Sequence, residues 1–260
     1  MIFDSQKDPI EELKKLAEVG RQSIIIEGPQ GCGKTYLSRF YANLINSEDF
    51  SVIQPKVNDI REALDSCATL TNKIVLCVEN LDLGVASASY TLLKSLEEPS
   101  PNIYILITCR NVKGVPDTII SRSAVVTVGP PTINDIDLYG QSKDILKFNN
   151  VSSRLVWKCV RSFKDADQVI AMSPDEVQYY ENLGALCKFN ESVSNIIWKI
   201  GHYESGKESI IELSIRSIME LMKNPFITQC GISCISDLNL GRIAQHAILA
   251  KFVFDAKYCE

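Results

Sequence analysis

The chain of 260 residues is long enough for two or three compact units, each with its own apolar core. Its hydrophobic content of 45% and charged content of 23% are ordinary for a globular protein. The formal net charge of −5 gives no general attraction for nucleic acid. The composition therefore argues against a simple DNA-coating protein, and any contact with nucleic acid depends on a local basic surface.

The N-terminus and the cysteines both bear on the cellular compartment. The first eight residues are too charged for a secretion signal, and no run of eighteen apolar residues predicts a membrane span. The nine cysteines are odd in number and show no paired C-x-x-C spacing, which favours a reducing cytoplasm. Cys230 and Cys234 match half of a zinc site, but no second pair or nearby histidine completes it. We therefore expect a cytoplasmic protein with no membrane partner.

Helical and strand patterns alternate through the first half of the chain. Asp8 and Pro9 open a short amphipathic helix, with Asp8 as the expected N-cap. The expected strands cover residues 23–26, 50–53, 73–78, 103–108 and 124–128, and the expected helices cover 36–42, 57–64 and 87–98. Continuous apolar strands are typical of a sheet buried on both faces. The alternation predicts a parallel sheet with helices on both faces.

The segment Gly129-Pro130-Pro131 is the clearest boundary in the sequence. Beyond it the spacing of apolar residues favours helices over 133–148, 151–163 and 174–189, and again after Ser192. We expect an α/β domain over residues 1–129, a small helical domain over 130–175 and a C-terminal helical domain over 176–260.

A phosphate-binding loop follows the first expected strand. The residues Gly28-Pro29-Gln30-Gly31-Cys32-Gly33-Lys34-Thr35 fit the pattern G-x-x-x-x-G-K-[ST] at every fixed position. Its glycines let backbone N–H groups face a triphosphate, while Lys34 brings a positive charge and Thr35 a hydroxyl for Mg²⁺. The helix that follows favours an anion at its N-terminus. A glycine-rich turn that matches by chance is the alternative, but the strand before the loop and the helix after it favour a nucleotide site.

Five segments together resemble one protein family. In chain order they are the phosphate loop, Ile60-Arg61-Glu62-Ala63-Leu64, Glu79-Asn80-Leu81-Asp82, the L-L-K-x-L-E-E-P run at 92–99 and Pro116 to Arg122 with its T-I-x-S-R run. This series resembles the AAA+ subunits of DNA polymerase clamp loaders, closest to the delta-prime and tau/gamma subunits of bacterial DNA polymerase III. The resemblance covers most of the first half, and the helical second half resembles the family's lid and collar only in type.

The resemblance implies ATP and Mg²⁺ as cofactors. It also implies a five-subunit ring or spiral that opens a sliding clamp and places it on primer–template DNA. Within that assembly Arg122 matches the arginine finger, which reaches the γ-phosphate of the neighbouring subunit's ATP, and Ser123 replaces the family's cysteine. An ordinary surface arginine at a strand start is the alternative. Lys94 is expected to follow DNA phosphates, and a solvated lysine on a helix face is the alternative.

The acidic strand end departs from the family pattern. ATP-hydrolysing relatives carry Asp-Glu there, for Mg²⁺ and for the attacking water. Alignment on Asp82 puts Glu79 at the metal position and Asn80 at the position of the base, and Asn80 cannot accept a proton. A slip of one residue would make Glu79 the base and leave Val78 at the metal position. Either alignment predicts ATP binding with weak hydrolysis.

Two further arginines match sensor positions of the family. Arg110, or Asn111 beside it, ends a strand where the family places a polar sensor of the γ-phosphate. Arg154 occupies the place of the second sensor arginine, with a solvated helix-start arginine as the alternative. The family's four-cysteine zinc module is absent and the helical tail is short, as a compact phage-encoded version would explain.

Two other classes of function remain open. A self-contained P-loop NTPase, such as a small-molecule kinase, would need an acceptor site and an arginine lid acting within one chain, and no motif for either is present. A scaffold with a relic loop would not bind ATP.

Overall fold

The computed structural model describes residues 3–67, 71–143, 155–173, 177, 215–216, 218–219, 225–240 and 245–258. The chain divides into two compact units. The first consists of Met1–Asp135 together with Ser162–Lys164, and the second of Ile136–Arg161 together with Asp165–Glu260.

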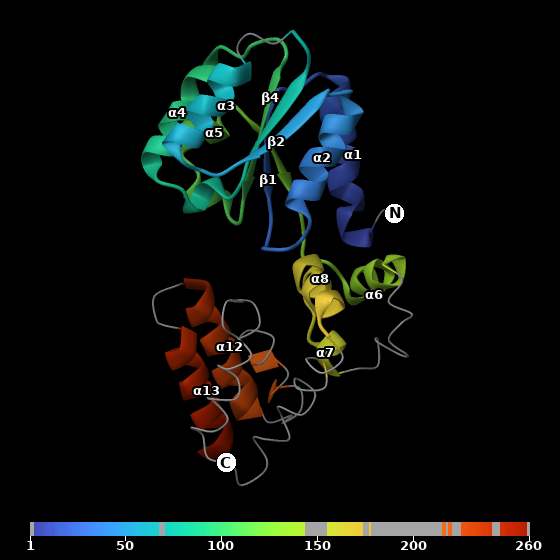
Figure 1. Ribbon diagram of the computed structural model, residues 1–260, viewed down its shortest axis with the longest axis vertical. Helices are drawn as coiled ribbons and strands as arrows, with labels where there is room; N and C mark the ends of the chain where they lie inside the picture. Colours follow the sequence, from blue (N-terminus) through green and yellow to red (C-terminus); the bar gives the residue numbers. More distant parts are fainter. Residues whose placement is uncertain are drawn as a thin grey trace. The chain divides into compact units, whose positions relative to one another are not determined.

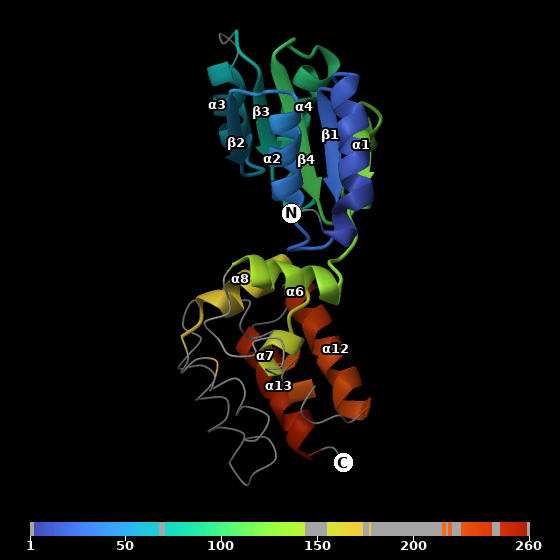
Figure 2. The ribbon, with the colours of Figure 1, turned by 90° about the vertical axis from the view of Figure 1, so that its right-hand side faces the viewer.

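The first unit is built on a five-stranded parallel sheet with the order β2-β3-β4-β1-β5. The strands are β1 Ser23–Glu27, β2 Asp49–Ile53, β3 Ile74–Val78, β4 Ile103–Cys109 and β5 Ala124–Thr127. In β1, which lies between β4 and β5, Ile25 is opposite Ile107 of β4 and Val125 of β5. Figure 2 shows β2, β3, β4 and β1 side by side in this order. Because every pairing is parallel, all strands end at the same edge of the sheet.

Helices cover both faces of this sheet. They are α1 Lys7–Glu18, α2 Lys34–Leu44, α3 Val57–Cys67, α4 Ala86–Glu97 and α5 Asp117–Ile120, with short 3₁₀ turns η1 Asp4–Gln6, η2 Leu81–Leu83 and η3 Val112–Gly114. Figure 1 shows α1 and α2 on one face and α3, α4 and α5 on the other. The predicted α/β fold with a parallel sheet is confirmed.

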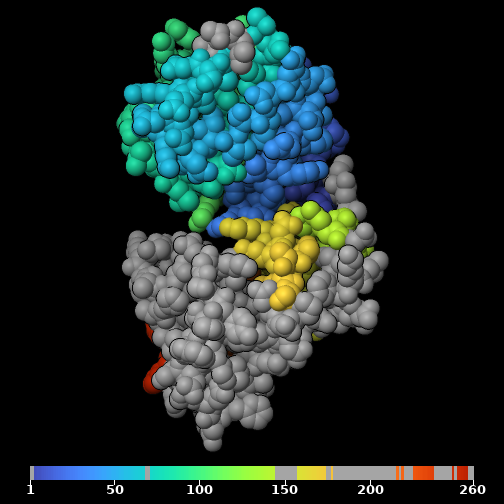
Figure 3. Space-filling model, viewed as in Figure 1, coloured from blue at the N-terminus to red at the C-terminus, as the bar shows by residue number. Residues whose placement is uncertain are grey.

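The sheet is buried on both faces because its strands alternate between two cores. Ile24 and Ile26 point toward Leu37 and the helices α1 and α2, whereas Ile25 packs with the cluster of α3, α4 and α5. All three isoleucines of β1 are fully buried. This explains the continuous apolar run, since neither face of the strand meets water. In the space-filling view of Figure 3 the first unit, coloured blue to green, forms one packed body.

One boundary differs from the prediction at the N-terminus. The helix α1 begins at Lys7, so Asp8 lies in its first turn and does not cap it. The reason is that η1 runs directly into α1, with Gln6 at the N-cap position. The backbone is therefore already helical when it reaches Asp8.

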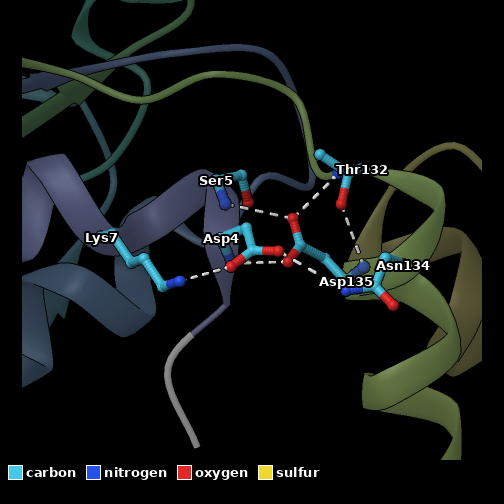
Figure 4. Close-up of polar contacts among 6 residues, drawn as sticks. All are labelled: Asp4, Ser5, Lys7, Thr132, Asn134 and Asp135. Carbon is cyan, nitrogen blue, oxygen red and sulfur yellow. Dashed lines mark hydrogen bonds and ion pairs between the residues drawn. The ribbon is translucent and has the colours of Figure 1, made fainter.

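Asp135 joins the N-terminal segment to the start of α6 Ile133–Ser142. Its carboxylate is fully buried and accepts hydrogen bonds from the backbone N–H groups of Asp4 at 2.6 Å, Ser5 at 3.2 Å and Thr132 at 3.0 Å. The Asp135 N–H in turn donates to Thr132 Oγ1 at 3.1 Å (Figure 4). This reciprocal pair is a capping box, which satisfies amide donors at a helix start.

The described part of the second unit is helical. Besides α6 it contains α7 Leu155–Lys158, α8 Phe163–Ala171, α12 Pro225–Leu240 and α13 Gln245–Tyr258. Its core includes Trp157, Ile215 and Phe252. No helix among the described residues is long and apolar enough to cross a bilayer.

The continuous helix expected over 151–163 is wrong, because α7 ends at Lys158 and α8 begins at Phe163. The Asp165 carboxylate, in the first turn of α8, accepts the Arg161 N–H at 3.1 Å and forms an ion pair with Arg216. These contacts stabilise a separate helix start at Phe163. The helix expected over 174–189 lies outside the described residues apart from position 177. The boundary expected near residue 175 adjoins residues outside the described ranges and stays a prediction.

Candidate nucleotide-binding site

The loop between β1 and α2 has a backbone that only glycine adopts without strain at two positions. Gly31 has φ of +74° and Gly33 has φ of +94°. A Cβ at Gly28 would lie 2.5 Å from the carbonyl oxygen of Val128, so this position requires glycine for a different reason. The local geometry therefore explains the two fixed glycines of the motif, Gly28 and Gly33, and also Gly31 between them.

The start of α2 offers amide donors to an anion. The first helical bond runs from the Leu37 N–H to the carbonyl oxygen of Gly33 at 3.0 Å. The N–H groups of Lys34, Thr35 and Tyr36 therefore have no acceptor within the helix. Together with the helix dipole they form a site that suits phosphate oxygens.

The Lys34 amine lies under this loop. Lys34 Nζ donates to the carbonyl oxygens of Gly28 at 2.7 Å and Pro29 at 2.8 Å, and the residue is only 8% exposed. Burial lowers the pKa of Lys34, and the positive charge of Arg110 acts in the same direction. A buried ammonium group with a second positive charge near it favours the binding of a polyanion.

Thr35 and Glu79 meet at the end of β3. The Thr35 hydroxyl donates to Glu79 Oε1 at 2.6 Å. Glu79 follows β3 directly and is fixed there by its N–H, which donates to the carbonyl oxygen of Ile53. Hydroxyl and carboxylate oxygens suit Mg²⁺, which usually takes one or two protein ligands and completes its shell with phosphate and water oxygens. These two residues therefore fit a Mg²⁺ bound with a nucleotide, where the ion would neutralise phosphate charge.

Asn80 occupies a left-handed backbone conformation next to this pair, with φ of 49° and ψ of 51°. Asparagine tolerates this region better than most residues. The Asn80 N–H donates to Thr108 Oγ1 at 3.0 Å, which joins the end of β3 to β4. The side chain that follows Glu79 is thus an amide, which cannot take a proton from water.

Asp82 fixes the end of β4, where Arg110 and Asn111 lie. Its Oδ2 accepts the N–H of Arg110 at 3.0 Å and that of Asn111 at 3.4 Å. Asn111 Oδ1 then accepts the Lys113 N–H at 2.9 Å. Arg110 Nε is buried and has no hydrogen-bond partner within the described part of the chain. Of the two, Arg110 is the one whose charge acts on Lys34.

Arg122 lies at the other edge of the sheet. It precedes β5, whereas the phosphate loop follows β1, and these strands are parallel neighbours. The two sites are thus separated by the length of the strands, which for four to five residues is about 15 Å. The structure does not bring Arg122 to the phosphate loop of its own chain.

The remaining predicted residues fall into three groups. Pro29 and Gln30 are exposed at the loop tip, and Cys32 is buried beneath it. Burial raises the pKa of the Cys32 thiol, which makes it a packing group and not a nucleophile. Arg154 lies outside the described residues.

Sequence reasoning missed residues that support the loop. The fully buried Gln6 donates from Nε2 to the carbonyl oxygen of Cys32 at 3.2 Å, and the Phe163 N–H donates to the carbonyl oxygen of Gly31 at 3.0 Å. The position of Thr108 at the end of the predicted strand 103–108 does not reveal that its hydroxyl accepts the Asn80 N–H. A hydroxyl inside the apolar strand β4 was the one available signal for it, and Gln6 gave none.

A family model and curated relatives match the first half of the chain. Residues 43–132 match the family described as DNA polymerase III, delta subunit. The sliding-clamp-loader large subunit of Escherichia phage RB69 is 31% identical over 134 residues, 48% of this chain and 42% of that subunit. DNA polymerase III subunit delta′ of Haemophilus influenzae is 34% identical over 87 residues, 34% of this chain and 26% of that subunit. The chain thus covers less than half of the length of the curated relatives that it matches.

The fold also matches a solved structure. A DNA polymerase III gamma-subunit-related protein of Thermotoga maritima superposes with a TM-score of 0.65 at 16% identity, covering 96% of this chain and 99% of that one. At this identity the match speaks for the fold alone. Over its first half the chain is therefore similar to clamp-loader subunits of bacterial DNA polymerase III and of phages, and it shares the fold of the gamma-subunit-related protein.

Proposed function

We propose that this chain is a subunit of a sliding-clamp loader that binds Mg-ATP at its phosphate loop. The observation that carries the proposal is the hydrogen bond from Thr35 to Glu79 beside the buried amine of Lys34. A hydroxyl, a carboxylate and an ammonium group then surround the place where the β- and γ-phosphates would lie. The helix start of α2 adds amide donors to the same place.

Hydrolysis by this site is proposed to be weak. Glu79 is engaged with Thr35 and suits the metal, which leaves the side chain of Asn80 at the position of the base. An amide does not act as a general base, and removal of such a base typically costs about 10²–10⁴ in rate. The binding of ATP, more than its hydrolysis, would then drive conformational change in the assembly.

The arginine finger is proposed to act between subunits. Arg122 lies at the sheet edge away from its own phosphate loop, so it can complete only a nucleotide held by another chain. A planar, permanently charged guanidinium suits the charge that develops on a transferred phosphoryl group. This supports an oligomer with nucleotide between subunits, which we propose to be pentameric as in the family.

The sliding clamp and primer–template DNA are the proposed partners of the whole assembly. Lys94 is exposed on α4. This exposure is compatible with a contact to DNA phosphates and equally with a solvated lysine that has no partner role. We propose a reducing cytoplasm as the compartment, because the nine cysteines show no paired C-x-x-C spacing. The helical second half is proposed to divide near residue 175 into a lid and a collar-like domain, with Arg154 and Arg110 as sensors of the γ-phosphate.

A thermal-shift experiment tests the nucleotide site. Mg-ATP at about 100 times its Kd should add about 2.7 kcal/mol to stability, or roughly 5–10 °C in Tm for a chain of this size. Lys34→Met keeps the apolar stem and removes the charge, so it should abolish the shift. Lys113→Met, at an exposed lysine of η3, is the matched control and should keep it. No shift in the unaltered chain would favour the relic scaffold.

Phosphate release measured in the same samples tests the second part of the proposal. Slow turnover is expected, alone and in the assembly. Fast turnover that Lys34→Met abolishes would contradict weak hydrolysis, and phosphorylation of a metabolite by a monomer would favour the kinase alternative.

A further inference from the structure

Arg122 is bound to a carboxylate of its own chain. Arg122 Nη2 donates to Glu97 Oε1 at 2.7 Å, and Nη1 donates to the carbonyl oxygen of Thr118 at 2.8 Å. The side chains of Arg122 and Glu97 are nevertheless 35% and 51% exposed. A carboxylate and a backbone carbonyl oxygen thus accept from the two Nη atoms of a guanidinium that is still partly exposed to solvent.

Neighbouring elements fix the backbone on both sides of this ion pair. Glu97 is the last residue of α4, which stops before Pro99. On the other side Arg21 Nη2 donates to the carbonyl oxygen of Arg122 at 2.8 Å, and the hydroxyls of Ser23 and Ser123 lie 2.6 Å apart. The backbone at Arg122 is therefore held to the start of β1, while its long side chain keeps freedom to leave Glu97.

The strength of the ion pair suits a contact that is made and broken. An exposed pair of this kind shifts an equilibrium by no more than about five-fold. A triphosphate carries more charge than one carboxylate, and its oxygens can accept two N–H donors of a guanidinium at once. Glu97 can therefore hold Arg122 only until a nucleotide on another chain competes for it.

We propose that Glu97 is a resting counter-ion for Arg122, which must release Arg122 before Arg122 reaches the ATP of the neighbouring subunit. This inference rests on the role of Arg122 stated under the proposed function. Glu97 is then a positioning residue that acts through Arg122. Its negative charge competes with the neighbouring subunit's nucleotide for Arg122, so it weakens the binding of that nucleotide.

The test compares Glu97→Gln with Glu98→Gln. Glu98 is the adjacent, exposed glutamate, so its variant makes the same change of charge one residue away. The measurement is the Kd of Mg-ATP in the assembly of the full chain with its partner subunits, at the site that receives Arg122. Glu97→Gln should tighten binding about two- to five-fold, and Glu98→Gln should leave it unchanged. In the isolated chain Glu97→Gln should not change ATP binding, because Glu97 lies at the far edge of the sheet.

A double-mutant cycle separates this inference from the proposed function. In an Arg122→Ala background Glu97→Gln should have no effect, since the counter-ion then has nothing to hold. If Arg122→Ala weakens binding but Glu97→Gln leaves it unchanged or weakens it, the counter-ion role is overturned while the finger stands. If Arg122→Ala has no effect in the assembly, the finger assignment itself fails.

Discussion

Gly33 joins the backbone geometry of the loop to the residues that support it. Its φ of +94° is unfavourable for any side chain, and a Cβ there would lie 2.5 Å from Gln6 Nε2. Gln6 is fully buried and holds the carbonyl oxygen of Cys32. A methyl group at Gly33 would therefore move the loop as well as strain it.

Gly33→Ala should abolish the stabilisation by Mg-ATP and lower the free energy of unfolding by about 1–2 kcal/mol. Gly20→Ala is a matched control, because Gly20 also has positive φ, of +66°, but nothing lies within 4 Å of its Cβ position. It should cost similar stability and keep the nucleotide effect. Urea unfolding with and without Mg-ATP measures both quantities, and equal loss of the ATP effect in the two variants would contradict this account of the loop.

The residues of the site differ in how far the sequence reveals them. The loop from Gly28 to Thr35 can be recognised from its spacing, because the residues proposed to bind phosphate are neighbours in one short segment of the chain. Gln6 and Cys32 are 26 residues apart, and their contact depends on how α1 packs on the sheet. No local pattern records such a contact, so sequence reasoning identified the loop and missed its support.

At the scale of elements, Asp135 stabilises the start of α6 and the N-terminal segment together. Burial would raise the pKa of Asp135, but the hydrogen bonds from the backbone of Thr132 and from Ser5 outweigh it, and the pKa is lowered. A carboxyl group with a lowered folded-state pKa adds stability that is fully present above its unfolded pKa, near 4, and is lost as pH falls through the lower folded value.

Asp135→Asn should lower the free energy of unfolding at pH 7 by about 1–3 kcal/mol, because an amide replaces a charged acceptor of three N–H groups. The difference from the unaltered chain should shrink below pH 4, because the carboxyl group of the unfolded chain takes up its proton there before the native one does. Asp8→Asn, at the exposed start of α1, is the control and should change little. Urea unfolding between pH 3 and 7 measures this, and a difference independent of pH would contradict the assigned charge.

The elements themselves were largely predictable where burial was uniform. The isoleucine run of β1 and the apolar runs of β3 and β4 leave no alternative to buried parallel strands. The break between α7 and α8 was not predictable, because it depends on Asp165, whose partner Arg216 lies 51 residues away in the sequence. Apolar spacing alone cannot detect a helix start that a distant charge stabilises.

At the scale of the whole molecule, the parallel sheet separates the residues of the two proposed functions. The ends of β1 and β3 carry the phosphate loop and Glu79, while the edge before β5 carries Arg122. Under our proposal, such a chain would present a nucleotide at one edge and a charged arginine at the other. It would then complete a site only by meeting another chain.

The most direct test is the Kd of Mg-ATP for the unaltered chain and for Arg122→Ala, each measured in isolation and in the assembly. We predict that the variant binds as the unaltered chain does when isolated, and that in the assembly the site facing residue 122 binds ATP at least about ten-fold more weakly, as loss of a charge-assisted contact implies. Weaker binding by the isolated variant, or unchanged binding in the assembly, would contradict a site shared between two chains.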